Sequence, residues 1–269
     1  MQHHESAIHK ASAMIRNASR ITVFSGAGMS QESGIPTFRD PGGLWDNVDL
    51  VEAGSAEGLI RAIEHHAHTL FPLFLNILDA FENAAPNPGH LALAEMEGLG
   101  ILHTIITQNI DNLHQEAGNT RVVEVHGNVF RSTCMGCGHM ETTARKPFIQ
   151  NLRSKINRLA SFDLEILLTL MSTCTQCGSM MRPDVVMFGE QVHHIDKAFD
   201  AARECDVMLV LGTSGVVYPA AYLPAEAKQN GARIIVINPA VNAFMEEADI
   251  YIPMKTGEAL PIIMNLIKN

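Results

Sequence analysis

Two cysteine pairs with the same short spacing limit how this chain can fold more than any other feature. Cys134 and Cys137 form the first pair, Cys174 and Cys177 form the second, and a glycine follows each pair. Each pair places two thiolates on one tight turn, and two such turns supply the four ligands of a tetrahedral zinc site. Four thiolates leave no open position on the metal, so we expect a structural rather than a catalytic zinc ion. A redox-active Cys-x-x-Cys pair is the main alternative.

The sequence around these cysteines differs in character from the rest of the chain. It holds many turn residues and a helical pattern over residues 151–171, whereas strand and helix patterns alternate on either side of it. Such alternation predicts an α/β fold with a parallel sheet. We therefore expect residues 1–129 and 185–269 to form the sheet domain and residues 130–184 to form an inserted zinc-binding module.

The apolar pattern predicts the individual elements of the sheet domain. Buried strands are expected at residues 20–25, 101–107, 122–126, 207–211, 234–237 and 250–252. Helices are expected at residues 4–18, 55–82, 90–97 and 224–231. We expect Pro72 to break or kink the second helix and Gly231 to end the last one.

Composition and charge exclude several classes of protein. Apolar residues make up 46% of the chain and charged residues 18%, which indicates a globular protein with a buried core. The formal net charge of -10 disfavours direct binding to nucleic acid and favours basic partners, although many proteins are acidic for solubility alone. We find no apolar segment long enough to cross a membrane and no signal-peptide core, so we expect a cytoplasmic protein.

A glycine-rich loop follows the first expected strand. It begins Gly26-Ala27-Gly28-Met29-Ser30 and continues through Ile35 to Phe38, Arg39 and Trp45. Glycines at the end of a strand let backbone N–H groups approach a pyrophosphate closely. The third glycine of the ordinary dinucleotide-binding pattern is missing, which disfavours a dehydrogenase and leaves a ligand-free turn as an alternative.

Polar residues also follow the later strands, where parallel sheets bind ligands. Gln108, Asn109 and Asp111 follow the second strand; their side chains suit a carboxamide such as that of nicotinamide, and an Asx turn could coexist with this role. His126 ends the third strand and can take a proton from a hydroxyl near neutral pH. Gly212-Thr213-Ser214 and Asn238-Pro239 follow two further strands, and their small or polar residues suit contact with ribose or phosphate.

Together these motifs resemble those of the sirtuin family of NAD-dependent protein deacylases. The matching segments include Gly-Ala-Gly-x-Ser, Gly-Ile-Pro-x-Phe-Arg, Gln-Asn-Ile-Asp, Val-His-Gly, both cysteine pairs and Phe-Gly-Glu, in the family's order. The resemblance runs from Gly26 to the last expected strand. It implies a Rossmann-like domain with an inserted zinc module. It also implies transfer of an acyl group from protein lysine to ADP-ribose, with release of nicotinamide and O-acyl-ADP-ribose.

The same resemblance assigns roles to individual residues. It makes His126 the general base and makes Asn109 and Asp111 the residues that position the cofactor. The residues implied to contact NAD are Gly26, Ala27, Gly28, Ser30, Ile35, Phe38, Arg39, Trp45, Gln108, Asn109, Ile110, Asp111, Gly212, Thr213, Ser214, Asn238, Pro239 and Ala259. The residues implied to bind the acyl-lysine peptide are Val186, Met187, Phe188, Gly189 and Glu190. For single residues, ordinary readings stay open: a core aromatic at Phe38, a surface charge at Arg39 and a plain strand before Gly189.

The expected acyl group is neutral. Residues 215–221 resemble the sirtuin branch that includes succinyl-lysine-removing members, which use a Tyr and an Arg three residues apart. Residues 71–77 carry no such pair, and burying a succinyl carboxylate without a cation would be costly. Mono-ADP-ribosyl transfer, NAD hydrolysis and a non-enzymatic NAD-sensing module are the rival functions. His126 and the segment Val186 to Glu190 together favour deacylation.

Overall fold

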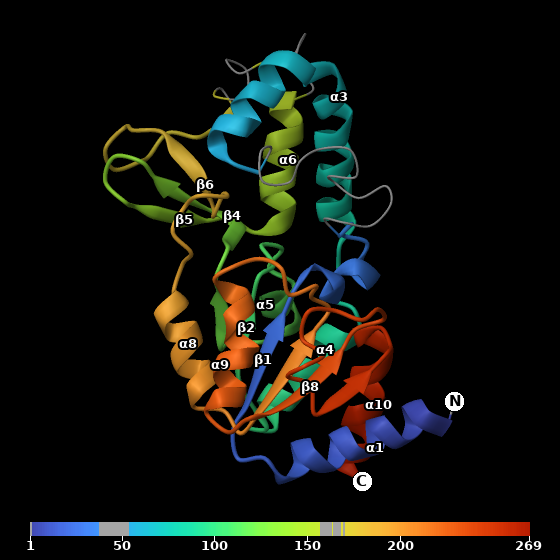
Figure 1. Ribbon diagram of the computed structural model, residues 1–269. Coiled ribbons are helices and arrows are strands. Elements are labelled where there is room, and N and C mark those ends of the chain that lie inside the picture. The colour runs from blue at the N-terminus through green and yellow to red at the C-terminus, as the bar shows by residue number, and fades with distance from the viewer. Residues whose placement is uncertain (1, 38–53, 157–162, 164–167, 169) are drawn as a thin grey trace. The chain divides into compact units, whose positions relative to one another are not determined.

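The structure is a computed structural model that describes residues 2–37, 54–156, 163, 168 and 170–269. Its internal contacts divide the chain into two compact units. The first, which we call the sheet unit, comprises Met1–Ser33, Ala85–His126 and Val192–Asn269. The second, which we call the cysteine unit, comprises Gly34–Ala84 and Gly127–Gln191. Figure 1 shows the ribbon of the chain coloured by residue number.

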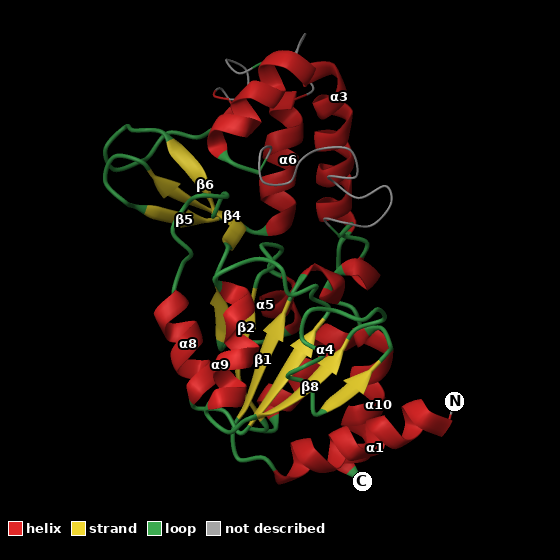
Figure 2. Cartoon of the chain, in the orientation of Figure 1, coloured by secondary structure: helices red, strands yellow, loops and turns green. Residues whose placement is uncertain are grey.

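A parallel sheet of six strands, in the order β3-β2-β1-β7-β8-β9, forms the centre of the sheet unit (Figure 2). The strands are β1 (Ile21–Ser25), β2 (Leu102–Thr107), β3 (Val122–Glu124), β7 (Val207–Leu211), β8 (Arg233–Ile237) and β9 (Ile250–Ile252). The chain runs outward from β1 to β3 and later returns beside β1 at β7. Order reversal of this kind opens a crevice at the carboxyl ends of the two central strands, where α/β sheets bind ligands. All six expected strands are present, which confirms the α/β fold.

Helices cover both faces of this sheet. They are α1 (Gln2–Asn17), α4 (Pro88–Gly98), α5 (Leu113–Ala117), α8 (Ile195–Arg203), α9 (Leu223–Gln229) and α10 (Thr256–Lys268), with the 3-10 turns η1 (Ala27–Met29), η2 (Gln31–Ser33) and η3 (Ala220–Tyr222). Val23 and Leu209 face a core shared with α1, α4 and α10, whereas Phe24 and Val210 face a core shared with α8 and α9. Because successive strand residues point to opposite faces, covering both faces requires the continuous apolar runs seen in β1 and β7.

In its described residues, the cysteine unit combines a small antiparallel sheet with helices. The sheet has the order β5-β4-β6, with β4 (Gly127–Cys134), β5 (Met140–Thr142) and β6 (Met181–Val185). The helices α3 (Ala56–Asn83) and α6 (Arg145–Ile156) enclose a second apolar core around Leu78, Phe130 and Ile149.

The two helices of this unit differ in detail from expectation. The helical path of α3 breaks at His66 (φ -134°, ψ 23°), whereas Pro72 lies inside the helix, so the expected break at Pro72 was misplaced. A proline removes one backbone hydrogen bond and crowds the preceding turn, and the distortion can be taken up upstream of the ring. Helix α6 begins earlier than expected, at Arg145, with Pro147 in its first turn, where proline is tolerated.

Among the helices in the described part of the chain, none is both long enough and apolar enough to cross a bilayer.

Candidate active site and metal centre

The glycine-rich loop after β1 packs directly on the backbone that follows β7. The N–H of Gly26 donates to Leu211 O (3.0 Å) and the N–H of Gly28 donates to Gly212 O (2.8 Å). A Cβ atom on Gly28 would lie 2.8 Å from Gly212 O, and one on Gly212 (φ +54°) would lie 2.3 Å from Met29 N. These glycines therefore permit close backbone contact at the reversal point. The N–H groups of Gly26 and Gly28 therefore have acceptors inside the protein.

A buried polar network joins this loop to the residues after β2. The Asn109 amide donates to Gly26 O (3.1 Å) and to Ser30 Oγ (3.0 Å), and Ser30 Oγ donates to Asp111 Oδ2 (2.6 Å). Asp111 Oδ1 accepts a hydrogen bond from Leu113 N (2.9 Å), which is an Asx turn at the start of α5. The exposed fractions of Asn109, Asp111 and Ser30 are 8%, 4% and 1%. The network holds the two polar side chains in a fixed arrangement.

His126 follows β3 and is fixed by the backbone of the neighbouring loop. Its Nδ1 lies 3.1 Å from Gln108 O. A carbonyl oxygen can only accept, so Nδ1 carries the hydrogen and Nε2 has an open lone pair. Burial lowers the pKa of His126, and the charge of His193 lowers it further against the opposing effect of the Gln108 carbonyl. His126 is therefore neutral at neutral pH, in the form that a general base requires.

The residue after this histidine must be glycine. Gly127 has φ +83°, and a Cβ atom there would lie 1.9 Å from Asp184 O on the paired strand β6. Backbone geometry therefore explains the glycine of the Val-His-Gly sequence independently of any ligand.

Gln108 connects the loops after three strands. Its Nε2 donates to Thr213 Oγ1 (3.0 Å), and its backbone N–H donates to Ser25 O (3.0 Å). Asn242, after β8, donates to Thr213 O (2.8 Å). The polar residues predicted at the ends of β2 and β7 thus lie together at one edge of the sheet.

The other residues predicted to contact NAD are placed in several ways. Ala27, Ile110 and Asn238 are half-buried, Ile35 is buried, and Ser214 and Pro239 are exposed. Ala259 has no exposed surface and belongs to the apolar core beneath α10. Phe38, Arg39 and Trp45 lie outside the described residues.

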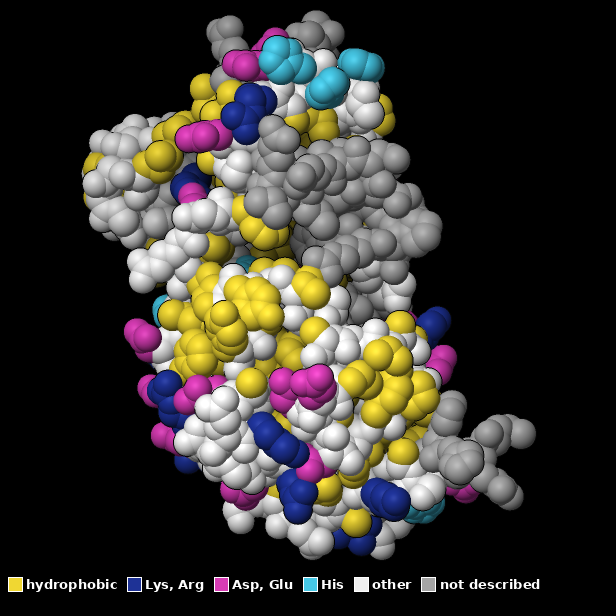
Figure 3. Space-filling model, viewed as in Figure 1, with side chains coloured by type: hydrophobic (Ala, Val, Ile, Leu, Met, Phe, Trp, Pro, Cys, Tyr) yellow, Lys and Arg dark blue, Asp and Glu magenta, His cyan; other side chains and the backbone are white. Residues whose placement is uncertain are grey.

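Between Gly212 and α9 the chain exposes an apolar surface. Val216, Tyr218 and Tyr222 are all exposed, and the two tyrosine rings lie 4.6 Å apart. Figure 3 shows hydrophobic side chains gathered at this end of α9. The surface is suited to contact with a peptide or another apolar partner.

Asn87 is a supporting residue that the sequence interpretation missed. Its Nδ2 donates to Met29 O (2.8 Å) and Ser33 Oγ (3.1 Å), while its Oδ1 caps α4 by accepting from Gly89 N (2.9 Å). The signal available was an asparagine directly before a proline at the first helical position. Through Asn87, the start of α4 holds the glycine-rich loop.

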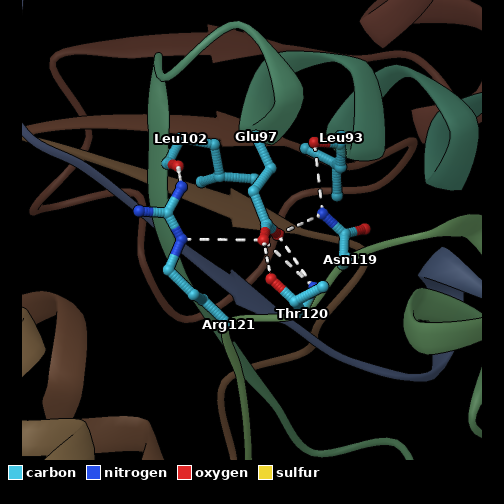
Figure 4. Close-up of polar contacts among 6 residues, drawn as sticks. All are labelled: Leu93, Glu97, Leu102, Asn119, Thr120 and Arg121. Carbon is cyan, nitrogen blue, oxygen red and sulfur yellow. Dashed lines mark hydrogen bonds and ion pairs between the residues drawn. The ribbon is translucent and has the colours of Figure 1, made fainter.

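The other end of α4 is tied to the loop before β3 (Figure 4). The Glu97 carboxylate accepts hydrogen bonds from Thr120 N (3.0 Å), Thr120 Oγ1 (2.6 Å) and Asn119 Nδ2 (2.8 Å). Arg121 lies 3.6 Å from the same carboxylate and donates to Leu102 O (2.7 Å). Helix α4 is therefore anchored at both ends by charged or polar side chains.

In the cysteine unit, the segment predicted to bind peptide follows β6. Glu190 receives two hydrogen bonds from Arg182 (2.6 and 2.8 Å) and one from Met187 N (3.0 Å). Phe188 N donates to Gly54 O (3.0 Å), and the Phe188 side chain is 40% exposed. The Glu190 carboxylate therefore fixes the conformation of the segment that contains it through hydrogen bonds.

The four cysteines of the two pairs converge on one point. All four Sγ atoms lie within 4.8 Å of one another, with Cys134–Cys177 at 3.4 Å and Cys137–Cys174 at 3.8 Å. Four thiolates at the usual Zn–S distance in a tetrahedron lie about 3.8 Å apart. The donor set and its spacing fit a structural zinc ion.

The two cysteine turns have the same backbone hydrogen bonds. In each, the N–H of the first cysteine donates to the carbonyl five residues later (2.8 Å), and the N–H four residues later donates back (3.1 and 3.0 Å). Gly138 (φ +72°) and Gly178 (φ +77°) supply the left-handed conformation expected after each pair. Hydrogen bonds from Ser179 lower the pKa of Cys177 to about 6, which favours the thiolate that a metal needs.

Comparison with known proteins gives consistent matches. The model of the Sir2 family matches residues 26–219. An NAD-dependent protein deacylase of Desulfosudis oleivorans is 53% identical over 264 residues, covering 98% of this chain and 97% of the relative. A solved Sir2 homolog–NAD complex has a TM-score of 0.76 at 32% identity, covering 96% of this chain and 93% of that one. A solved Sir2–p53 peptide–NAD+ complex has a TM-score of 0.74 at 28% identity, covering 95% and 96%.

Proposed function

This chain belongs to the Sir2 family, and from that premise we propose that it is an NAD-dependent protein-lysine deacylase. The products are free lysine, nicotinamide and O-acyl-ADP-ribose. The observation that carries the proposal is His126, held with an open Nε2 lone pair by a bond to the carbonyl of Gln108. Asn109 and Asp111 follow this glutamine in the chain and are fixed by Ser30.

When bound, NAD supplies the ADP-ribose that accepts the acyl group and nicotinamide as the leaving group. The residues that we propose to hold it are Gly26, Ala27, Gly28, Ser30, Ile35, Gln108, Asn109, Ile110, Asp111, Gly212, Thr213, Ser214, Asn238 and Pro239. Their fit rests on chemistry, because Asn109 and Asp111 present amide and carboxylate groups that complement a carboxamide and ribose hydroxyls. Their geometry is set before any ligand binds, which reduces the ordering cost of binding.

His126 acts as the general base of the proposed reaction. Nε2 takes a proton from a ribose hydroxyl, and the Nδ1–H bond to Gln108 O keeps the ring oriented. That carbonyl also stabilises the imidazolium formed when the proton arrives.

Substrate binding uses the segment from Val186 to Glu190. We propose that an extended acyl-lysine peptide pairs with its backbone, and that Val186, Met187 and Phe188 line the acyl-lysine channel. Neutral acyl groups are preferred, because residues 71–77 of α3 offer no cation and Phe71 and Phe74 pack on the apolar core of the cysteine unit. The four cysteines hold a structural zinc ion. In this proposal residues 1–129 and 185–269 bind NAD, and residues 130–184 form the zinc module.

The test measures nicotinamide release from NAD with acetyl-, succinyl- and long-acyl-lysine peptides. Release should depend on peptide, should favour neutral acyl groups and should be lost in His126→Ala. His9→Ala on the exposed face of α1 is the matched control and should behave like the wild type. Release without peptide would instead indicate NAD hydrolysis or ADP-ribosyl transfer, and robust turnover of succinyl-lysine would contradict the acyl preference.

A further inference from the structure

Two buried histidines lie beneath the candidate site and take no part in the proposed mechanism. His90, in the first turn of α4, is 0% exposed, and His114, in α5, is 1% exposed. Their ring centroids lie 4.9 Å apart at an interplanar angle of 61°. Burial lowers the pKa of His90 to about 4. Burial, reinforced by the charge of His90, also lowers the pKa of His114. Both rings are therefore neutral at neutral pH, and each carries a single N–H.

Hydrogen bonding fixes which nitrogen of His90 carries the hydrogen. Asn87 N donates to His90 Nδ1 (3.4 Å), as part of the capping box at the start of α4. Nδ1 is therefore an acceptor, and the hydrogen is on Nε2. Among the described residues, no group accepts from this Nε2–H, although it is fully buried.

The hydroxyl of Ser25 fixes the hydrogen of His114 in the same way. Ser25 Oγ donates its only hydrogen to Thr107 Oγ1 (2.9 Å), so its contact with His114 Nε2 (3.0 Å) uses a hydrogen from the imidazole. His114 Nδ1 is then an acceptor, and within the described parts of the chain it has no partner either. The opposite tautomer would leave two unpaired N–H donors, one on each ring, in the same buried space, which is the costlier arrangement.

We propose that His114 is a positioning residue for the cofactor site, fixed by a hydrogen bond that it receives at Nδ1 from His90 Nε2–H through one buried water. The unused donor of one ring and the unused acceptor of the other are complementary, and each would otherwise carry the cost of an unmade hydrogen bond. The role of His114 in NAD binding rests on the proposed function. The tautomers of the two rings rest only on the hydrogen bonds described above.

The pair stands at the start of a chain of hydrogen bonds that ends at the candidate site. From His114 the chain passes through Ser25 to Thr107, whose Oγ1 also accepts the backbone N–H of Asn109 (3.1 Å). His90 belongs to the same capped turn as Asn87, which holds the glycine-rich loop. The histidine contact therefore links the support of that loop to the support of Asn109.

The first experiment measures the NAD dissociation constant by calorimetry without peptide. His114→Phe keeps the ring and removes both nitrogens, and it should weaken NAD binding by about tenfold, the effect of losing one buried hydrogen bond. His114→Gln retains a donor for Ser25 and should recover most of that loss. Ser25→Ala breaks the same chain of hydrogen bonds, leaves both imidazole rings in place and should also weaken NAD binding. His103→Phe, a change of the same type on β2, is the control and should leave the dissociation constant unchanged.

The second experiment reads the tautomers directly from long-range 1H–15N spectra of the wild-type protein at neutral pH. Both rings should be in the Nε2–H form. A Nδ1–H tautomer at His114, or equal NAD affinities for His114→Phe and His114→Gln, would overturn the proposal. If His114→Phe does not fold, Ser25→Ala and the spectra decide. Failure of the proposed function would appear separately, as NAD binding without peptide-dependent nicotinamide release.

Discussion

The sheet unit and the two cysteine turns are held together by different forces. The sheet unit buries large apolar cores on both faces of its strands, and the polar groups at its carboxyl edge are fixed by one another. The cluster at the turns buries Cys134, Cys174 and Met181. Each buried apolar side chain contributes about 1.5–3 kcal/mol, which is too little here to offset the entropy of ordering two turns. The sheet unit is thus self-supporting, whereas the turns depend on a metal ion.

Removing the metal should have the largest effect and should separate the two regions. Cys174→Ala or strong chelation should abolish zinc binding, which contributes on the order of 10 kcal/mol at a structural four-cysteine site. Hydrogen exchange should show loss of protection in β4, β5 and β6, with β1 and β7 still protected. Cys205→Ala, at a buried cysteine outside the cluster, should retain a full zinc content. Equal loss of protection in both regions would show that the sheet unit is not self-supporting.

Acid should destabilise the sheet unit through His90. Its pKa is about 4 in the folded protein and 6.5 in the unfolded chain, so only the unfolded state takes up the proton between these values. Stability is therefore complete above pH 6.5 and falls as the pH is lowered toward 4, by about 3 kcal/mol in total. The measurement is hydrogen exchange of β1 amides across this range, which separates the effect from protonation of the cysteines. His90→Gln should reduce the slope, with the remainder due to His114, whose pKa burial also lowers. His9→Gln, at an exposed position of α1, is the control; a slope unchanged in His90→Gln would exclude this histidine as a cause.

Glu97→Gln should weaken the sheet unit by a smaller amount. The amide keeps the shape of the side chain but loses the charge and exchanges one acceptor oxygen for a donor, so the ion pair with Arg121 and the hydrogen bonds at one of the two oxygens are lost. We expect a loss of about 1–2 kcal/mol in urea unfolding. Glu95→Gln, two residues earlier in α4 and with an exposed ion pair to Lys268, should cost less. Similar losses in the two variants would show that the Glu97 contacts contribute no more than a surface ion pair.

The smallest effect is expected in the segment after β6. Arg182→Lys loses the two-bond contact with Glu190, but this contact is only partly buried, so its contribution is about 1 kcal/mol or less. The KM for an acyl peptide should rise two- to threefold, consistent with that energy, with the NAD dissociation constant unchanged. Arg203→Lys, at a comparable ion pair on α8, serves as the control. A change in NAD affinity in Arg182→Lys would mean that this contact acts beyond its own unit.

Sequence patterns predict those parts of the structure that depend on local spacing. The apolar runs of β1 and β7 predict buried strands, and the spacing of the four cysteines favours one shared metal site over a redox-active pair. The structure confirms the strands and brings the four sulfur atoms together. Contacts between distant residues carry no such pattern. Glu32 accepts a hydrogen bond from Gly257 N at the start of α10 (2.8 Å), and Ser25 meets His114, but neither residue type indicates its partner. The sequence patterns also missed two helices. Helix α10 was missed because Pro261 interrupts its helical pattern, and α5 was missed because it is only five residues long.

The cysteine cluster has a consequence for how the family can vary. The chain leaves the cluster at Cys137 and returns to it at Cys174, so the ion closes a long excursion that includes α6. The entropy of closing such an excursion grows only with the logarithm of its length, by about 0.6 kcal/mol for each doubling. Evolution can therefore lengthen or shorten the parts of this stretch that lie outside β5 and the apolar core around α6 at little thermodynamic cost while both ends stay clamped. Among relatives of this chain, insertions and deletions should concentrate between the two cysteine turns and avoid the tightly packed glycine contacts at the end of β7.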